Sequence, residues 1–93
     1  MRTIEPTTQF RRDYKRELKS AIGPSLEPLL AAVISDLAND ALLPAKFRDH
    51  ALTGDWKTHR DCHIRPDLVL IYQKPDEATL RLVRLGSHSE LGI

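Results

Sequence analysis

Residues 58–74, THRDCHIRPDLVLIYQK, combine two patterns that decide the fold. Side chains first alternate between two faces, so that His59, Asp61 and His63 point to one side of a predicted strand. Residues 67–74 are then apolar on both faces, which is typical of a strand in the centre of a sheet. The stretch therefore predicts two neighbouring strands with titratable side chains gathered on one face.

The flanking segments complete the order of elements. A turn at residues 75–77 leads into a third strand over residues 78–86. On the other side, residues 44–57 have no sustained period and form a long connection, a kind of segment that often carries function. Near the start of the chain, residues 2–5 suit a short strand that Pro6 ends.

The region between the first strand and the long connection predicts two helices. Thr7 or Thr8 can cap the first helix, whose apolar face repeats at helical spacing through Phe10, Tyr14, Leu18 and Ile22. Ser25 can cap the second helix, whose buried stripe is expected at Leu26, Leu29, Leu30, Val33 and Leu37. This order predicts an α/β (α+β) fold, with both N-terminal helices packed on one face of an antiparallel sheet and the other face open to water.

Composition bounds the class of protein. We expect a single domain over residues 1–93, with 41% hydrophobic and 29% charged residues. No apolar run approaches the roughly 18 residues that a membrane span needs, and no secretory signal is apparent. The single cysteine, Cys62, excludes an internal disulfide. A cytoplasmic protein is therefore expected.

Charge is unevenly distributed although the net charge is +1. Residues 11–19 are basic, residues 25–43 are acidic on balance, and the second half is basic again through Lys57, Arg60, Arg65, Lys74, Arg81 and Arg84. Basic surface of this kind permits contact with phosphate backbones, although Lys and Arg often serve only to keep a surface soluble.

The histidines suggest proton transfer, because an unperturbed imidazole has a pKa of about 6.5. A solvated strand face is the simpler interpretation of the cluster at residues 59–67, and we expect His59 to be such a residue. Cys62 faces away from His59 and His63, which argues against a cysteine nucleophile. On a strand, His59 and His63 are about 13 Å apart along the chain, which does not suit a zinc site. No metal and no cofactor is expected.

Residues 47–74, FRDHALTGDWKTHRDCHIRPDLVLIYQK, and residues 81–91, RLVRLGSHSEL, closely resemble the YafQ branch of the RelE-like toxins. These are the ribosome-dependent mRNA interferases of bacterial toxin–antitoxin pairs. The match lies in the order and spacing of Asp49-His50, Leu52, Gly54, Trp56, Arg60-Asp61, His63, Pro66-Asp67, Ile71-Tyr72, Gly86 and His88.

The resemblance implies a RelE-like fold and an endoribonuclease that cleaves mRNA in the ribosomal A site. Its expected partners are an antitoxin, the ribosome and, through the antitoxin, operator DNA. Catalytic residues of that branch match His88, His63, Asp67 and His50, with His88 favoured as the acid on a mobile terminal segment. His50 and Asp67 are also open to simpler interpretations, as a loop-packing residue and a turn residue.

Metal-free RNA cleavage also needs groups that hold the strand and stabilise the charged phosphorane. The expected RNA contacts are Asp61, Arg60, Arg84 and Arg81. Strand alternation predicts that only one of Arg81 and Arg84 lies on the open face.

One departure from the family keeps an alternative open. An aromatic residue commonly follows the family's counterpart of Leu91, whereas this chain has Gly92 and then Ile93. Loss of an aromatic that stacks on a base would weaken the grip on RNA. The alternative is a catalytically degenerate toxin that only binds antitoxin, DNA or ribosome. Trp56 is expected in the core rather than in base stacking.

Overall fold

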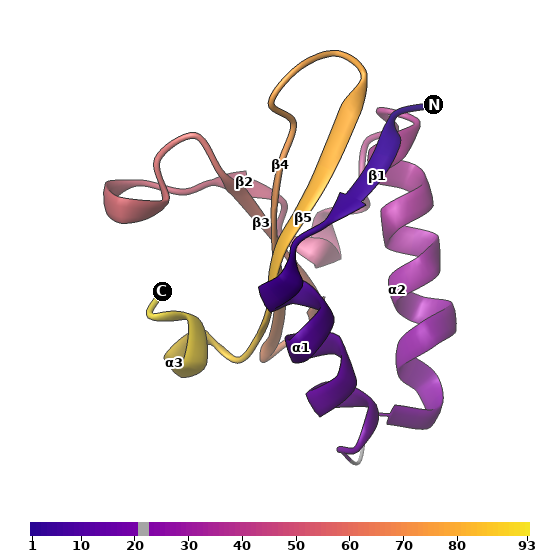
Figure 1. The fold of residues 1–93 in the computed structure, drawn as a ribbon, viewed down its shortest axis with the longest axis vertical. Coiled ribbons are helices and arrows are strands. Elements are labelled where there is room, and N and C mark those ends of the chain that lie inside the picture. Colours follow the sequence, from indigo (N-terminus) through magenta and orange to yellow (C-terminus); the bar gives the residue numbers. More distant parts are fainter. Residues whose placement is uncertain (21–22) are drawn as a thin grey trace.

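The computed structural model describes residues 1–20 and 23–93 (Figure 1). In that part of the chain the strands are β1 (Thr3–Pro6), β2 (His50–Ala51), β3 (Arg60–Arg65), β4 (Leu68–Gln73) and β5 (Thr79–Gly86). The helices are α1 (Thr8–Leu18), α2 (Gly23–Ala38) and the short α3 (His88–Leu91), with 3-10 turns η1 (Ala45–Phe47) and η2 (Gly54–Trp56) in the long connection. None of the described helices is long and apolar enough to cross a membrane.

The strands form one sheet in the order β1-β5-β4-β3-β2. The predicted central strand, β4, pairs antiparallel with β3 and β5. The edge strand β1 pairs parallel to β5, with Thr3 opposite Thr79, and is the exception to the antiparallel pattern. The predicted α/β class, with both N-terminal helices on one face of the sheet, is confirmed (Figure 1).

The helices bury one face of the sheet because their apolar residues recur at helical spacing. Thr7 caps α1 as predicted, and its Oγ1 accepts a hydrogen bond from the N–H of Phe10 at 3.0 Å. The core on this face joins Phe10, Leu26, Leu30, Val33 and Leu37 of the helices with Cys62, Ile64, Leu70, Tyr72, Leu80 and Leu82 of the sheet. Each buried aliphatic or aromatic side chain of this size contributes about 1.5–3 kcal/mol relative to exposure.

Two details of the helix prediction are wrong. Ser25 lies inside α2 and is not its cap, because the helix already begins at Gly23 and holds Pro24 in its first turn, where a missing N–H costs no hydrogen bond. Leu18 is 41% exposed, since α1 ends at this residue. Ile22 lies outside the described residues.

The second face of the sheet is not open to water as predicted. Val69, Ile71 and Leu91 are buried on it, and Leu52, Trp56 and Val83 pack against them. The later part of the long connection, from Leu52 to Trp56, and α3 lie over this face, on the side of the sheet away from α1 and α2 (Figure 1), whereas Phe47 of η1 packs on the helical side. Trp56 is thus a packing residue, as predicted.

Beyond the residues of β5 that pair with β1, the N-cap residue and two side chains of α1 form hydrogen bonds with the backbone of β5. Oγ1 of Thr7 donates to the carbonyl of Val83 at 2.9 Å, and Nη2 of Arg16 donates to the carbonyl of Leu85 at 2.8 Å. Between them, Oδ2 of Asp13 accepts from the N–H of Leu85 at 3.0 Å. The helix therefore satisfies backbone groups that an exposed edge would leave unpaired.

Candidate active site

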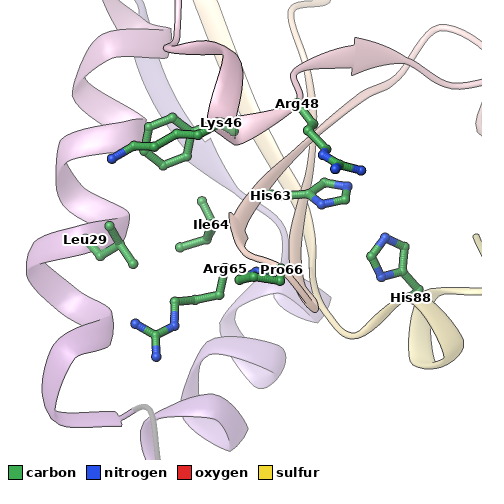
Figure 2. A pocket seen from close by; sticks show the side chains of 9 residues that line it. Leu29, Lys46, Arg48, His63, Ile64, Arg65, Pro66 and His88 are labelled. Carbon is green, nitrogen blue, oxygen red and sulfur yellow. The ribbon is translucent and has the colours of Figure 1, made fainter.

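Three histidines from separate segments come together beside β3. His63 is on β3, His50 is on β2 and His88 is the first residue of α3. The ring centroids of His63 and His88 are 4.9 Å apart, and those of His50 and His63 are 6.4 Å apart. In Figure 2 the rings of His63 and His88 border the same space. The structure therefore brings together the three histidines that the sequence selects as catalytic.

Asp67 joins this cluster through His88. It lies in the tight turn between β3 and β4, and its Oδ1 accepts from Nδ1 of His88 at 2.8 Å and from the backbone N–H of His88 at 3.2 Å. These hydrogen bonds lower the pKa of Asp67, so its carboxylate stays ionised. Because Nδ1 is engaged, Nε2 is the ring atom of His88 that is available to a substrate.

The segment that carries His88, which was expected to be a mobile tail, forms a capped helical turn. Oγ of Ser87 accepts from the N–H of Glu90 at 3.2 Å, and Oε1 of Glu90 accepts from the N–H of Ser87 at 3.0 Å. This capping box begins α3, and Leu91 anchors it in the apolar cluster on the second face.

Asp61 is a buried carboxylate next to His50. Its side chain is 3% exposed, and its Oδ1 lies 3.0 Å from Nδ1 of His50. That nitrogen lies 2.7 Å from the carbonyl of Arg48 and donates there, so Oδ1 of Asp61 receives no hydrogen bond among the described residues. Burial raises the pKa of Asp61, although the nearby histidines oppose this shift. The burial of the carboxylate argues against the predicted direct contact of Asp61 with RNA, which stays a prediction.

His63 favours its neutral form. Burial is the main reason that its pKa is lowered, and the charges of His88 and Arg48 lower it further, while Asp61 acts in the opposite direction. A neutral imidazole near pH 7 can accept a proton. Of the three histidines, His63 therefore suits the role of general base.

A hydrogen-bonded group fixes the long connection and with it Arg48 and His50. Oδ1 of Asp49 accepts from the hydroxyl of Tyr72 at 2.5 Å and from Nε of Arg60 at 3.2 Å. Tyr72 is buried on the central strand, so the connection is fastened to the centre of the sheet.

The predicted arginines are engaged within the protein. Arg60 forms an ion pair with Asp49 at 3.2 Å. Arg81 pairs with Glu5 and Arg84 pairs with Asp13, each at 2.8 Å. Contact with RNA through these three side chains stays a prediction, and it would have to compete with these ion pairs.

The expectation that strand alternation places only one of Arg81 and Arg84 on the open face is wrong. Arg81 lies opposite Gln73 and Arg84 lies opposite Ile71, and these two residues of β4 share one face. The reason is an irregularity in the pairing between Ile71 and Tyr72, which adds a residue on β5. Simple alternation cannot reveal such a bulge.

Sequence reasoning missed Arg48. Its guanidinium lies beside the ring of His63 in Figure 2, and its charge contributes to the lowered pKa of His63. Arg48 adopts a left-handed backbone conformation with φ 49° at the end of η1. The available signal was its place two residues before His50, in a connection without any regular period.

His59 does not share a strand face with Asp61 and His63. It precedes β3, and its ring meets Trp56 edge-on with centroids 5.3 Å apart. Thr58 has a positive φ of 78°, so the chain turns before the strand begins and the alternation does not extend back to His59. Cys62 is buried on the helical side, as its position in the strand predicted.

Residues 2–92 match the family of YafQ, bacterial toxins of type II toxin–antitoxin systems. The chain belongs to the YafQ toxin family. The resemblance drawn from residues 47–74 and 81–91 is therefore confirmed.

Three relatives cover nearly the whole chain. The mRNA interferase toxin YafQ of Escherichia coli strain K12 is 38% identical over 91 residues, which cover 97% of this chain and 95% of that protein. The E. coli DinJ–YafQ complex matches with a TM-score of 0.79 and 34% identity, covering 98% of each chain. A copper-bound mutant toxin from Helicobacter pylori matches with a TM-score of 0.86 and 39% identity, covering 98% of this chain and 99% of that one.

That relative holds copper, which raises the question whether side chains of the present protein are arranged to bind a metal ion. Within residues 1–20 and 23–93, no group of three or more His, Cys, Asp and Glu side chains is arranged to hold an ion. Nδ1 of His50 and Nδ1 of His88 are each directed at a protein oxygen. The absence of a metal requirement stays a prediction.

Proposed function

We propose that this protein is the toxin of a type II pair that cleaves mRNA in the ribosomal A site and so blocks translation. One observation carries the proposal: His50, His63 and His88 converge beside Asp67 in a chain of the YafQ family. The E. coli relative is an mRNA interferase, which supports the same activity here.

The reaction needs one base and one acid. The 2′-oxygen attacks the adjacent phosphorus while its proton passes to the base, and the 5′-oxygen leaves with a proton from the acid. Neutral His63 takes the first proton. His88 delivers the second from Nε2, since Asp67 holds Nδ1. The products are a cyclic phosphate and a 5′-hydroxyl end.

His50 and Asp61 support this pair. The carbonyl of Arg48 accepts from Nδ1 of His50, which leaves Nε2 as the ring atom available to the substrate. Asp61 places a buried negative charge 3.0 Å from His50 and near the other two rings. We assign Asp61 as a positioning residue that acts through the histidines.

The ribosome supplies what the isolated site lacks. Arg60, Arg81 and Arg84 are engaged in internal ion pairs, and the ribosome holds the message in line for attack. The protein therefore acts in the cytoplasm on ribosome-bound message. An antitoxin encoded next to it, as DinJ accompanies YafQ in the E. coli complex, covers the basic surface and links the pair to operator DNA.

Primer extension on translated mRNA tests the proposal. Discrete cuts that need ribosomes, and that disappear in a His88→Ala variant which still binds antitoxin, support it. Equal cutting of naked RNA overturns the ribosome requirement. A folded, antitoxin-binding protein that makes no cuts and does not arrest growth identifies the alternative, a degenerate toxin that only binds its partners.

A further inference from the structure

A groove of about 830 Å³ extends from the histidine pair toward α2 (Figure 2). His63 and His88 border one end of it. The remaining lining comes from α2, from the η1 segment and from the end of β3 with the following turn. An RNA strand whose phosphate lies between the rings of His63 and His88 can continue into this groove without leaving the protein surface.

The rim of the groove is cationic. Lys46, Arg48 and Arg65 are exposed, and no acidic side chain lines the groove. Among residues 1–20 and 23–93, none of the three has a carboxylate partner, in contrast to Arg60, Arg81 and Arg84. Uncompensated charge around one concave surface attracts an anion and raises its local concentration.

The floor of the groove is apolar. Leu29 of α2 and Ile64 of β3 line it (Figure 2), together with Phe47 of η1. Nζ of Lys46 lies 5.3 Å from the centre of the Phe47 ring, so the cationic rim and the apolar floor are adjacent. Cations that follow a backbone, combined with an apolar or aromatic surface for bases, are the usual means of binding single-stranded nucleic acid.

We propose that this groove binds the mRNA strand next to the scissile phosphate. Lys46, Arg48 and Arg65 hold flanking phosphates, and an unstacked base rests on Phe47. The inference rests on the proposed cleavage of mRNA and adds the surface that holds the strand. It also supplies a base-binding surface in a chain where Gly92 stands in place of an aromatic.

The test compares two triple variants that remove the same number of positive charges. The first is Lys46→Ala, Arg48→Ala and Arg65→Ala in the groove. The control replaces exposed cations of α1 by alanine: Arg11, Arg12 and Lys15. Single-turnover cleavage is measured on ribosomes programmed with one mRNA whose cut site has been mapped, over a range of ribosome and salt concentrations. Circular dichroism and chemical unfolding establish that both variants fold.

We expect the groove variant to raise the half-saturating ribosome concentration by about tenfold or more, while the rate at saturation falls much less. Its affinity should also depend less steeply on salt, because each lost phosphate contact reduces the slope by about 0.7–1. The α1 control should stay near the parent in both respects. Phe47→Ala should raise the half-saturating concentration without changing the salt slope, because a base contact releases no counterions.

Several outcomes overturn the inference. If the parent does not cleave, the proposed function fails, and with it the basis of the groove. If the parent cleaves and the groove variant matches it, the groove is not a strand-binding surface although the function stands. An equal loss in the α1 control shows a general effect of net charge. If the groove variant cleaves normally but no longer binds the co-expressed antitoxin, the groove belongs to the antitoxin interface instead.

Discussion

Two buried carboxylates stand out in the described chain, and their surroundings are opposite. Asp13, between α1 and β5, accepts hydrogen bonds from Gln9, Arg16, Arg84 and the backbone of Leu85. These hydrogen bonds outweigh burial and lower its pKa. Asp61 has an oxygen that receives no hydrogen bond, and burial raises its pKa.

This difference in hydrogen bonding separates a carboxylate that holds the fold together from one that serves the candidate active site. A buried charge with a full set of partners joins two elements and costs much if a partner is removed. A buried carboxylate with an oxygen that receives no hydrogen bond destabilises the fold and marks a place where function outweighs stability. On this basis Asp13 belongs to the scaffold, and Asp61 belongs to the group of His50, His63 and His88.

The largest effect on stability is expected for Asp13→Ala. The change leaves Arg84 and the N–H of Leu85 without their partner in a buried setting, and we expect a loss of about 3–5 kcal/mol in the free energy of unfolding. Urea unfolding monitored by circular dichroism measures it. The matched control is the exposed Asp36→Ala, which should stay within about 0.5 kcal/mol of the parent. A loss under about 1 kcal/mol for Asp13→Ala would remove the contrast with Asp61.

On the site side, His88→Ala should lower the single-turnover cleavage rate on the ribosome by about 10²-fold or more, with affinity almost unchanged. The physical reason is the loss of the proton for the leaving oxygen. His59→Ala is the control, since His59 packs on Trp56 and should cleave at the parent rate. A His88→Ala variant that binds antitoxin and cleaves normally removes His88 from the mechanism.

Asp67→Ala should cost less, about tenfold in the same rate, if Asp67 orients His88 rather than carrying the proton itself. The pH dependence of the cleavage rate distinguishes these two roles of Asp67, because a residue that only positions His88 changes this dependence through His88 alone. We expect Asp67→Ala combined with His88→Ala to be no slower than His88→Ala. Additive losses would instead assign Asp67 an independent chemical role.

Tyr72→Phe should destabilise the protein by about 1 kcal/mol, because it removes the hydroxyl that donates to Asp49. The same change should loosen the segment that carries Arg48 and His50. Hydrogen exchange of residues 44–57 measures this loosening, with α2 as the internal reference. Unchanged exchange in that segment would show that Asp49 and Arg60 fasten it without the tyrosine.

The smallest expected effect concerns pH: Asp13 and Asp61 should change the free energy of unfolding in opposite directions as the pH falls. The lowered pKa of Asp13 adds stability above the ordinary value of 3.8, and this is lost as the pH falls through the folded pKa below 3.8. The raised pKa of Asp61 makes the fold gain stability as the pH falls through its folded pKa toward 3.8. Unfolding of Asp13→Asn and Asp61→Asn relative to the parent, from pH 6 to about 3, should show these opposite slopes; parallel slopes contradict the assignment.

Much of this scaffold was predictable from the sequence. Alternation along β3 and the apolar run of β4 predicted the centre of the sheet, and helical spacing predicted most of the apolar residues that α1 and α2 bury, with Leu18 as an exception. The errors have physical causes that periodicity does not contain. A bulge put Arg81 and Arg84 on one face, and the long connection and α3 covered a face that was expected to be wet.

The site was predictable mainly through family resemblance. Nothing in the local pattern places His50, His63 and His88 together, since they come from three segments that only the tertiary structure joins. The burial of Asp61 and the position of Arg48 also depend on the connection at residues 44–57, which has no period to interpret.

The central claim is that Asp61 serves the histidines rather than the fold, and Asp61→Asn tests it most directly. The variant keeps the shape of the side chain and removes its charge. Two quantities are measured on the same preparation: the free energy of unfolding at pH 7 and the single-turnover cleavage rate on programmed ribosomes. We predict unfolding within about 1 kcal/mol of the parent or more stable, with cleavage about tenfold slower or worse. A variant as unstable as Asp13→Ala, or one that cleaves at the parent rate, contradicts the claim.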